Sequence, residues 1–100
     1  MNVTHLECSL TGERHEAGQV HNLSRAGKPL LVRYDLEAAA RTLTRDTLAA
    51  RESGMWKWRE LLPNDGEPVS LGEEETPIVP LLKTGGPKLL VKDEGRLPTG

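Results

Sequence analysis

The chain has 100 residues, which suits one small domain, and its 13 basic and 15 acidic residues give a formal net charge of −2. The two signs are interspersed, so the sequence predicts no basic surface for nucleic acid or an anionic membrane. No apolar run approaches the roughly 20 residues that cross a bilayer, and the first residues lack a basic and apolar leader. The expected location is therefore the cytoplasm, with no membrane and no nucleic-acid partner.

The composition offers little material for an independent core. Hydrophobic residues make up 36% of the chain, phenylalanine is absent, and the aromatic residues are Tyr34, Trp56 and Trp58. Ten glycines and seven prolines further limit regular structure. These features predict part of a larger fold that completes its core with other polypeptide.

The beginning of the chain is expected to form a small β-rich knuckle. Residues 1–29 are polar and rich in turns, and their short apolar pieces predict brief strands. These pieces are Val3, Leu6, Leu10, Val20 and Leu23. Residues 30–34 predict a better strand, because they include β-branched and aromatic side chains and follow a proline.

The middle of the chain is expected to be helical. Asp35 can cap a first helix that extends toward Arg51. Thr42 and Thr44 predict a break into two short helices, with Thr44 as the second N-cap. Gly54 stands where the helical region is expected to stop.

One further helical turn is expected over residues 56–62, before Pro63, and residues 64–66 predict a turn.

The last third of the chain is expected to be extended. Pro77 and Pro80 exclude helix from a loop at residues 71–80. Residues 81–93 predict two strands joined by a hairpin-like turn at residues 84–87. The apolar run that opens the second strand is typical of a buried strand.

The single cysteine is a candidate metal ligand. Cys8 has no partner for an internal disulfide. A metal site could combine Cys8 with His5, His15 and His21, but their spacing fits no known zinc pattern. The preferred interpretation is surface histidines beside a small buried thiol, with no metal bound.

Two turns at the start of the chain resemble a zinc ribbon. Residues 8–12 and 22–30 are similar to the Cys-x-x-Cys…Cys-x-Cys-Gly ribbon that some relatives of threonine synthase carry ahead of the catalytic fold. Three of the four ligand positions hold side chains other than thiolates, namely Thr11, Ser24 and Ala26. The resemblance therefore implies a degenerate ribbon, kept as scaffold.

Three later segments resemble the threonine synthase family in the family's own order. Residues 54–63 are similar to its Met-Trp-x-Tyr/Trp-x-Glu-Leu-Leu-Pro segment. Residues 69–78 are similar to its Ser-Leu-Gly-Glu-Gly-x-Thr-Pro-Leu signature, with Glu74 at the usual glycine. Residues 92–100, Lys-Asp-Glu-Gly-Arg-Leu-Pro-Thr-Gly, resemble the lead-in that continues in the family to Ser-Phe-Lys, whose lysine binds pyridoxal phosphate (PLP).

The tryptophan segment has two interpretations. Near-helical spacing favours packing of the arm against a catalytic body. The side chains expected to make this contact are Met55, Trp56, Leu61 and Leu62. The alternative is that Trp56 and Trp58 stack on a base or another ligand.

The acidic run at residues 73–75 is expected to be a solvated loop, because adjacent carboxylates in an extended segment point to opposite sides. This arrangement argues against catalysis by paired carboxylates. Glu74 would be strained if the position required a positive φ.

The resemblance implies an α/β fold, the N-terminal portion of a fold-type II PLP enzyme. Residues 1–34 would be the degenerate ribbon-like knuckle and its strand, and residues 35–66 the helical arm. Residues 67–100 would begin the PLP-dependent catalytic domain with the first strands of a larger sheet, ending before the lysine that forms the Schiff base.

The implied function is that of a PLP-dependent lyase in threonine biosynthesis, which converts O-phosphohomoserine and water to threonine and phosphate. PLP and a homodimer are expected for the full-length protein only, and the 100-residue chain is expected to be inactive, with no catalytic or cofactor-binding residue. Lys92 and Glu94 would position the lead-in loop, and Pro98, Thr99 and Gly100 would shape its turn.

Two alternatives stay open at this point. One is a related PLP enzyme, namely threonine dehydratase, cysteate synthase or diaminopropionate ammonia-lyase. The other, from a different class, is a non-catalytic interaction module that docks on a partner.

Overall fold

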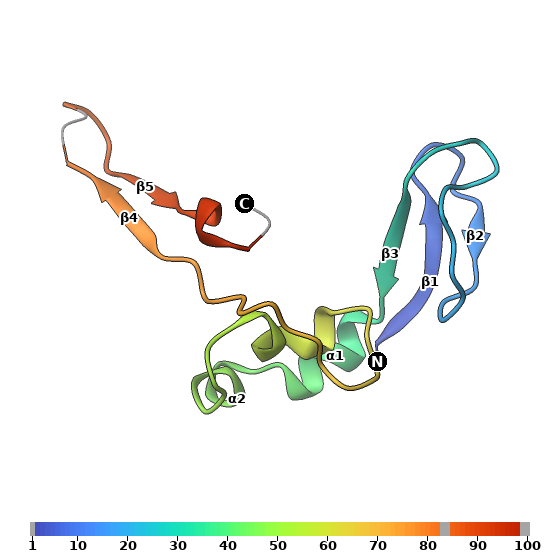
Figure 1. The fold of residues 1–100 in the computed structure, drawn as a ribbon, viewed down its shortest axis with the longest axis horizontal. Helices are drawn as coiled ribbons and strands as arrows, with labels where there is room; N and C mark the ends of the chain where they lie inside the picture. The colour runs from blue at the N-terminus through green and yellow to red at the C-terminus, as the bar shows by residue number, and fades with distance from the viewer. Residues whose placement is uncertain (1, 83–84, 99–100) are drawn as a thin grey trace.

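The molecule is elongated rather than compact. The computed structural model describes residues 2–82 and 85–98. Their arrangement places a small sheet at one end, short helices in the middle and a β-hairpin at the other end (Figure 1). The radius of gyration is 17.2 Å, whereas a compact chain of this length has about 13 Å. The chain therefore buries little of its own surface.

The knuckle is a three-stranded antiparallel sheet with strand order β2-β1-β3. Its strands are β1 (Val3–Cys8), β2 (Arg14–His15) and β3 (Leu30–Tyr34). The long pairing between β1 and β3 runs from Val3 opposite Tyr34 to Cys8 opposite Leu30, with an irregularity between Val3 and His5. The predicted strand at residues 30–34 is confirmed.

Three of the five apolar pieces predicted as brief strands are not strands. Leu10, Val20 and Leu23 lie in loops and are exposed. Gly12 and Gly18, with φ of 73° and 82°, turn the backbone beside two of them into the left-handed region, which a strand does not use. Turn chemistry therefore overrides the local β propensity here.

The helical middle follows the predicted caps. Helix α1 (Leu36–Thr42) begins where Asp35 Oδ1 accepts the Ala38 N–H at 2.9 Å. Helix α2 (Arg45–Ala49) begins at Thr44, which forms a reciprocal capping box with Thr47. Each cap satisfies amides that would otherwise be free. The predicted break into two short helices is confirmed. No helix in the described ranges has the length and apolarity to cross a membrane.

Gly54 has a different role from the predicted helix stop. Helix α2 already ends at Ala49, and Gly54 precedes the 3₁₀ helix η1 (Met55–Leu61) with φ of 125°. A Cβ at this position would lie 3.2 Å from the Glu73 carbonyl oxygen. The glycine therefore allows the loop near residue 73 to approach the start of η1 closely. The expected helical turn before Pro63 is confirmed as η1.

The last third forms an antiparallel hairpin of β4 (Ile78–Leu81) and β5 (Leu89–Lys92), followed by the short 3₁₀ helix η2 (Glu94–Arg96). The first strand begins three residues earlier than predicted and contains Pro80. A proline is tolerated because both strands of a two-stranded sheet have a free edge. Part of the predicted turn, Lys83 and Thr84, lies outside the described residues.

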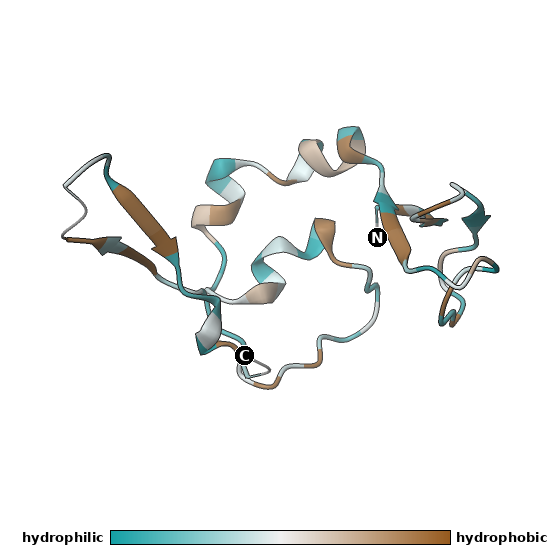
Figure 2. Ribbon diagram, turned by 90° about the horizontal axis from the view of Figure 1, so that it is seen from above, coloured by the Kyte–Doolittle hydropathy of each residue, from teal (hydrophilic) through white to brown (hydrophobic). Residues whose placement is uncertain are grey.

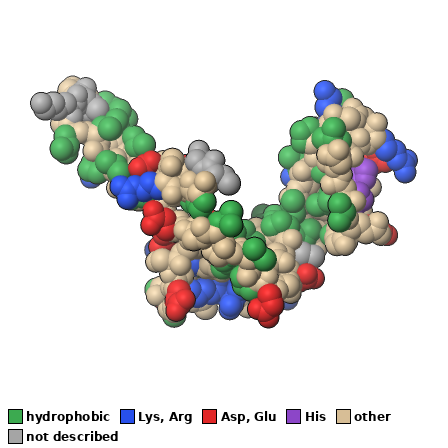
Figure 3. Space-filling view, in the orientation of Figure 1, with side chains coloured by type: hydrophobic (Ala, Val, Ile, Leu, Met, Phe, Trp, Pro, Cys, Tyr) green, Lys and Arg blue, Asp and Glu red, His purple; other side chains and the backbone are tan. Residues whose placement is uncertain are grey.

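The hairpin is exposed, which contradicts the predicted buried strand. Every residue of β4 and β5 is exposed. Apolar residues dominate both strands in the hydropathy view (Figure 2), and hydrophobic side chains gather along the hairpin in the space-filling view (Figure 3). Among the described hydrophobic residues, only Cys8 and Ala39 are buried.

An ion pair takes the place of a hydrophobic core in the middle of the molecule. Arg51, beyond the end of α2, donates to both carboxylate oxygens of Glu60 at 2.7 and 2.6 Å, and to the Lys57 carbonyl at 2.6 Å. Glu60 is only 8% exposed. The Arg51 guanidinium holds the pKa of Glu60 at about 2, below the ordinary 4.5.

We expect Glu60→Gln to lower the free energy of unfolding by about 1–3 kcal/mol, because a charge-assisted bidentate contact is lost. Since the folded-state pKa lies below the unfolded one, the carboxylate's contribution is complete above pH 4.5 and disappears as the pH falls toward 2. Urea unfolding followed by the fluorescence of the two tryptophans measures both effects. Exposed Glu67→Gln is the matched control, and equal losses in the two variants would contradict the prediction.

Candidate functional site

Three of the five predicted lead-in residues can be placed. Lys92 is the last residue of β5, Glu94 opens η2, and Pro98 follows η2. Thr99 and Gly100 lie outside the described residues, so the predicted turn at these positions stays a prediction.

The structure brings two distant segments together at a polar cluster, Thr76–Lys92–Glu94. Thr76 Oγ1 donates to Glu94 Oε1 at 2.8 Å, and Lys92 Nζ contacts both side chains. Thr76 is 8% exposed, while the other two side chains are more than half exposed. Hydrogen bonds from Lys92 and then Thr76 hold the pKa of Glu94 below its ordinary value. The cluster thus ties the Thr-Pro segment to the start of the lead-in.

The loop before Thr76 folds on itself. Glu73 accepts hydrogen bonds from the Ser70 hydroxyl at 2.6 Å and from the Leu71 N–H at 3.1 and 3.0 Å. Gly72, with φ of 87°, donates its N–H to Ser70 Oγ at 3.0 Å. Because glycines alone have positive φ among the described residues, Glu74 does not carry the expected strain.

Glu75 ties this loop to the helical arm. Its carboxylate accepts from Lys57 Nζ at 2.9 Å and from Ser53 Oγ at 3.1 Å. These contacts, the Lys57 one first, lower the pKa of Glu75. Since Glu73 and Glu75 face different partners, the acidic run is a set of local anchors rather than a pair of cooperating carboxylates.

An open groove of about 530 Å³ lies between η1, the acidic loop and the hairpin. Its apolar lining includes Met55 and Trp58, which are 38% and 41% exposed. Thr76, Lys92 and Glu94 form part of its polar lining. This groove was not predicted from the sequence, although the three-residue spacing of Met55 and Trp58 on a helical turn was a usable signal.

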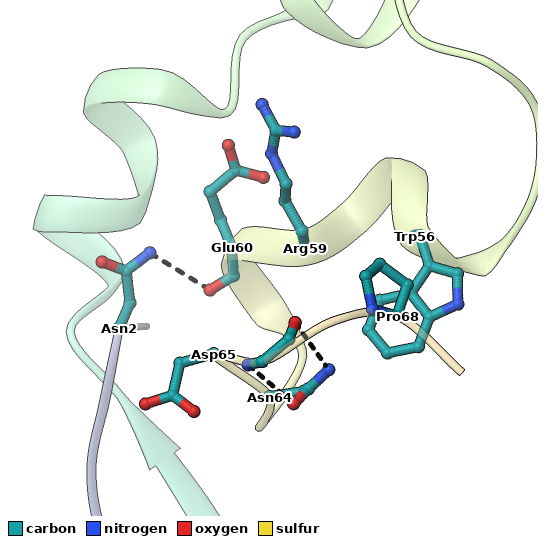
Figure 4. A pocket seen from close by; sticks show the side chains of 8 residues that line it. Asn2, Trp56, Arg59, Glu60, Asn64, Asp65 and Pro68 are labelled. Carbon is teal, nitrogen blue, oxygen red and sulfur yellow. Dashed lines mark hydrogen bonds between the residues drawn. The ribbon is translucent and has the colours of Figure 1, made fainter. Parts of the chain in front are cut away.

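A second cavity of about 450 Å³ lies beside the start of the chain (Figure 4). It is lined by Trp56 and by polar residues, including Asn2, whose Nδ2 donates to the Glu60 carbonyl at 3.2 Å. Asn64 Oδ1 accepts the Gly66 N–H at 3.0 Å, which confirms the predicted turn. Trp56 and Trp58 line different cavities, so they do not form one stacking platform.

The two ribbon-like turns meet through side chains. The Cys8 thiol and the Ser24 hydroxyl form a buried hydrogen bond with 3.0 Å between Sγ and Oγ. The Thr11 N–H points to Cys8 Sγ at 3.4 Å, and the Lys28 N–H donates to Ser24 Oγ at 3.2 Å. The hydrogen bond between the two side chains lowers the pKa of Cys8 from 9.0 to about 7. A sulfur–oxygen hydrogen bond thus joins the two turns.

The histidines are engaged elsewhere in the knuckle. His15 and His21 meet edge to face, with ring centroids 5.2 Å apart. His5 Nε2 lies 3.6 Å from Glu7 Oε2. In the described part of the chain, no three histidine, cysteine or acidic side chains gather as a metal site requires.

The described residues do not fit PLP by themselves. The cofactor needs a lysine amine free to form its covalent link and a set of donors for its phosphate. Lys57 and Lys92 are both held by glutamates, and the exposed Lys28 and Lys88 do not line the groove. The two α-helices are short, and Asp35 and Thr44 already cap their N-termini. We therefore derive no catalytic step from these residues.

Sequence comparisons relate the chain to two archaeal enzymes. It is 30% identical over 99 residues to the threonine synthase of Methanocaldococcus jannaschii, and 33% identical over 101 residues to the threonine synthase of Methanosarcina acetivorans. These alignments cover 93% and 96% of the chain.

The chain spans about a quarter, 24%, of the length of each of these relatives. No protein-family model matches the sequence, and no solved structure matches it. The chain is thus similar to threonine synthases along nearly its whole length.

Restoring thiolates should test whether the two turns face each other as ribbon turns do. We expect the triple variant Thr11→Cys, Ser24→Cys, Ala26→Cys to bind one zinc ion per chain, because four thiolates satisfy tetrahedral coordination. Cobalt titration with visible absorbance measures this binding. The matched control retains Ala26 and should bind markedly more weakly; equal binding, or none in the triple variant, would contradict the predicted geometry.

A second prediction concerns Thr76. We expect Thr76→Val, which keeps the shape and removes the hydroxyl, to speed amide hydrogen exchange over residues 93–97 by about 5- to 10-fold, the equivalent of roughly 1 kcal/mol for one hydrogen bond. The same substitution at exposed Thr4, on the distant strand β1, should leave that segment unchanged. Unchanged exchange in Thr76→Val would show that the cluster does not hold η2.

Proposed function

We propose that the chain is the N-terminal segment of a PLP-dependent, threonine synthase-like lyase. The full-length protein would convert O-phosphohomoserine and water to threonine and phosphate in threonine biosynthesis. Similarity to two threonine synthases along nearly the whole chain supports this proposal. PLP, the phosphorylated substrate and a homodimer belong to the full-length protein, and this chain contributes scaffold.

The Thr76–Lys92–Glu94 cluster is the observation that carries the proposal. The two motifs it joins lie 16 to 18 residues apart in the sequence, and their polar side chains meet at hydrogen-bond distance. Such a contact fixes the direction in which the chain leaves β5. A lysine that follows the lead-in must be aimed within a fraction of an ångström, so a rigid approach is what this chemistry needs.

The residues here would therefore be positioning residues. Thr76 would hold Glu94, and Glu94 would keep Lys92 folded against the lead-in rather than extended into solvent. The ion pair between Lys57 and Glu75 would hold the loop before Thr76 against the helical arm. The lysine that attaches PLP is assigned to a position outside this chain.

A non-catalytic interaction module is the second candidate. The exposed hairpin is the observation that favours it, because an apolar surface of this kind marks a contact with another polypeptide. The related PLP enzymes, threonine dehydratase, cysteate synthase and diaminopropionate ammonia-lyase, would share the same scaffold role. Substrate tests on the full-length protein separate these possibilities.

The decisive experiment is an assay of the natural gene product with O-phosphohomoserine. We expect threonine and phosphate in equal amounts, and borohydride reduction with peptide mapping should locate PLP on a lysine outside residues 1–100. Consumption of threonine or diaminopropionate, or formation of cysteate, would favour a related enzyme. A gene product that binds no PLP would favour the interaction module.

In the same protein, Lys92→Met should lower kcat/KM on the order of 10- to 100-fold, the range expected when a catalytic group is misplaced. Lys88→Met is the matched control, since Lys88 is an exposed lysine before β5, and its activity should stay near that of the wild type. A full-length enzyme in which both variants keep full activity would remove the positioning role of Lys92.

A further inference from the structure

The hairpin β4–β5 is apolar on both faces. Side chains alternate between the two faces of a strand. One face carries Val79, Leu81, Leu89 and Val91, and the other carries Ile78, Pro80, Leu90 and Lys92. An antiparallel sheet with one face in water alternates apolar and polar residues, whereas a sheet covered on both faces does not. The pattern therefore fits a hairpin that belongs within a sheet covered on both sides.

The hydrogen-bonding pattern of the hairpin identifies the backbone groups that point outward at its two edges. The Asp93 N–H donates to the Pro77 carbonyl at 2.9 Å, one step beyond the pairing of Ile78 with Lys92. In an antiparallel ladder the inward-facing residues alternate with outward-facing ones. The outward-facing residues are Ile78 and Pro80 on β4, and Leu90 and Lys92 on β5.

The two outer edges are consequently unequal. Pro80 has no N–H, so the edge of β4 lacks a donor at the centre of the strand. The edge of β5 offers both the N–H and the C=O of Leu90 and of Lys92. Proline at an edge is a known means of preventing strand addition. Among the described residues, this sheet has no third strand.

We propose that the outer edge of β5 pairs with a β-strand from the part of the enzyme outside this chain, and that β4 stays at the edge of the resulting sheet. The inference rests on the proposed function, since the chain spans 24% of the relatives' length and leaves about three-quarters of such an enzyme to supply the strand. The partner is a strand of a sheet with apolar elements on both faces.

A second copy of the chain is a poorer occupant. Two hairpins joined through their β5 edges would form a four-stranded sheet and satisfy the free backbone groups. Both faces of that sheet would still expose their apolar side chains, which are 41% to 62% exposed within the described strands. A strand from a covered sheet satisfies the edge and the faces together.

Residue-level hydrogen exchange on the natural gene product tests the proposal. The amides of Leu90 and Lys92 should exchange on the order of 100-fold more slowly than the amide of Ile78, because only the β5 edge is paired. Slow exchange at Ile78 with fast exchange at Leu90 would show that the edge of β4 is the paired one, which contradicts the proposal. Fast exchange at all three amides would show that neither edge is paired and would overturn the proposal, whatever the length of the gene product.

Two matched proline variants give an independent readout. Leu90→Pro removes an outward N–H from β5 and should prevent the full-length protein from folding. Ile78→Pro removes an outward N–H from β4 and should leave folding intact.

The dependence of hydrogen exchange on protein concentration identifies the occupant. Protection of Leu90 and Lys92 that increases with protein concentration would overturn the proposed strand in favour of a second copy of the chain. Protection without threonine synthase activity would leave the pairing standing and reject the proposed function alone.

Discussion

The middle of the molecule depends on the contact between Arg51 and Glu60. Glu60 uses its carboxylate to hold Arg51 and its backbone carbonyl to accept from Asn2, so one residue joins the end of α2 to the entrance of β1. Arg51 in turn holds the Lys57 carbonyl. The Lys57 side chain extends the same connection to the acidic loop through Glu75.

This polar chain of contacts explains how an elongated molecule keeps a defined order of parts. A protein with two buried hydrophobic residues among those described gains little from apolar burial, so directional contacts have to position its segments. Charge-assisted hydrogen bonds suit this task, because they are short and strongly dependent on geometry. They also make the arrangement sensitive to acid, since the pKa values of Glu60, Glu75 and Glu94 are all lowered by their partners.

The sequence predicted the features that local chemistry decides. Asp35 and Thr44 are predictable as caps, because a carboxylate or hydroxyl at a helix start accepts hydrogen bonds from the free amides of the first turn. The strand at residues 30–34 and the turn at Asn64 follow from equally local preferences. The strands predicted at Leu10, Val20 and Leu23 were wrong, because glycines in the left-handed region turn the backbone beside two of these residues.

Contacts between distant segments could not be predicted in the same way. Nothing in the sequence around Lys57 singles out Glu75 among its acidic neighbours, and nothing around Thr76 singles out Glu94. The Lys57–Glu75 pairing depends on how closely Gly54 lets the loop approach η1, and the Thr76–Glu94 pairing depends on the register of the hairpin. The groove beside Trp58 was missed for the same reason, since it exists only when the arm, the loop and the hairpin come together.

The hairpin and the Thr76–Lys92–Glu94 cluster at its base are directly connected. The Asp93–Pro77 hydrogen bond closes the base of the hairpin, and Thr76 and Glu94, the next residues outward on each side, continue the pairing through side chains. Any strand that pairs with β5 would therefore also fix the position of Glu94 and of the lead-in that follows. Packing at the apolar hairpin and aiming of the lead-in are in this way the same structural event, which links the most exposed surface of the chain to its proposed positioning role.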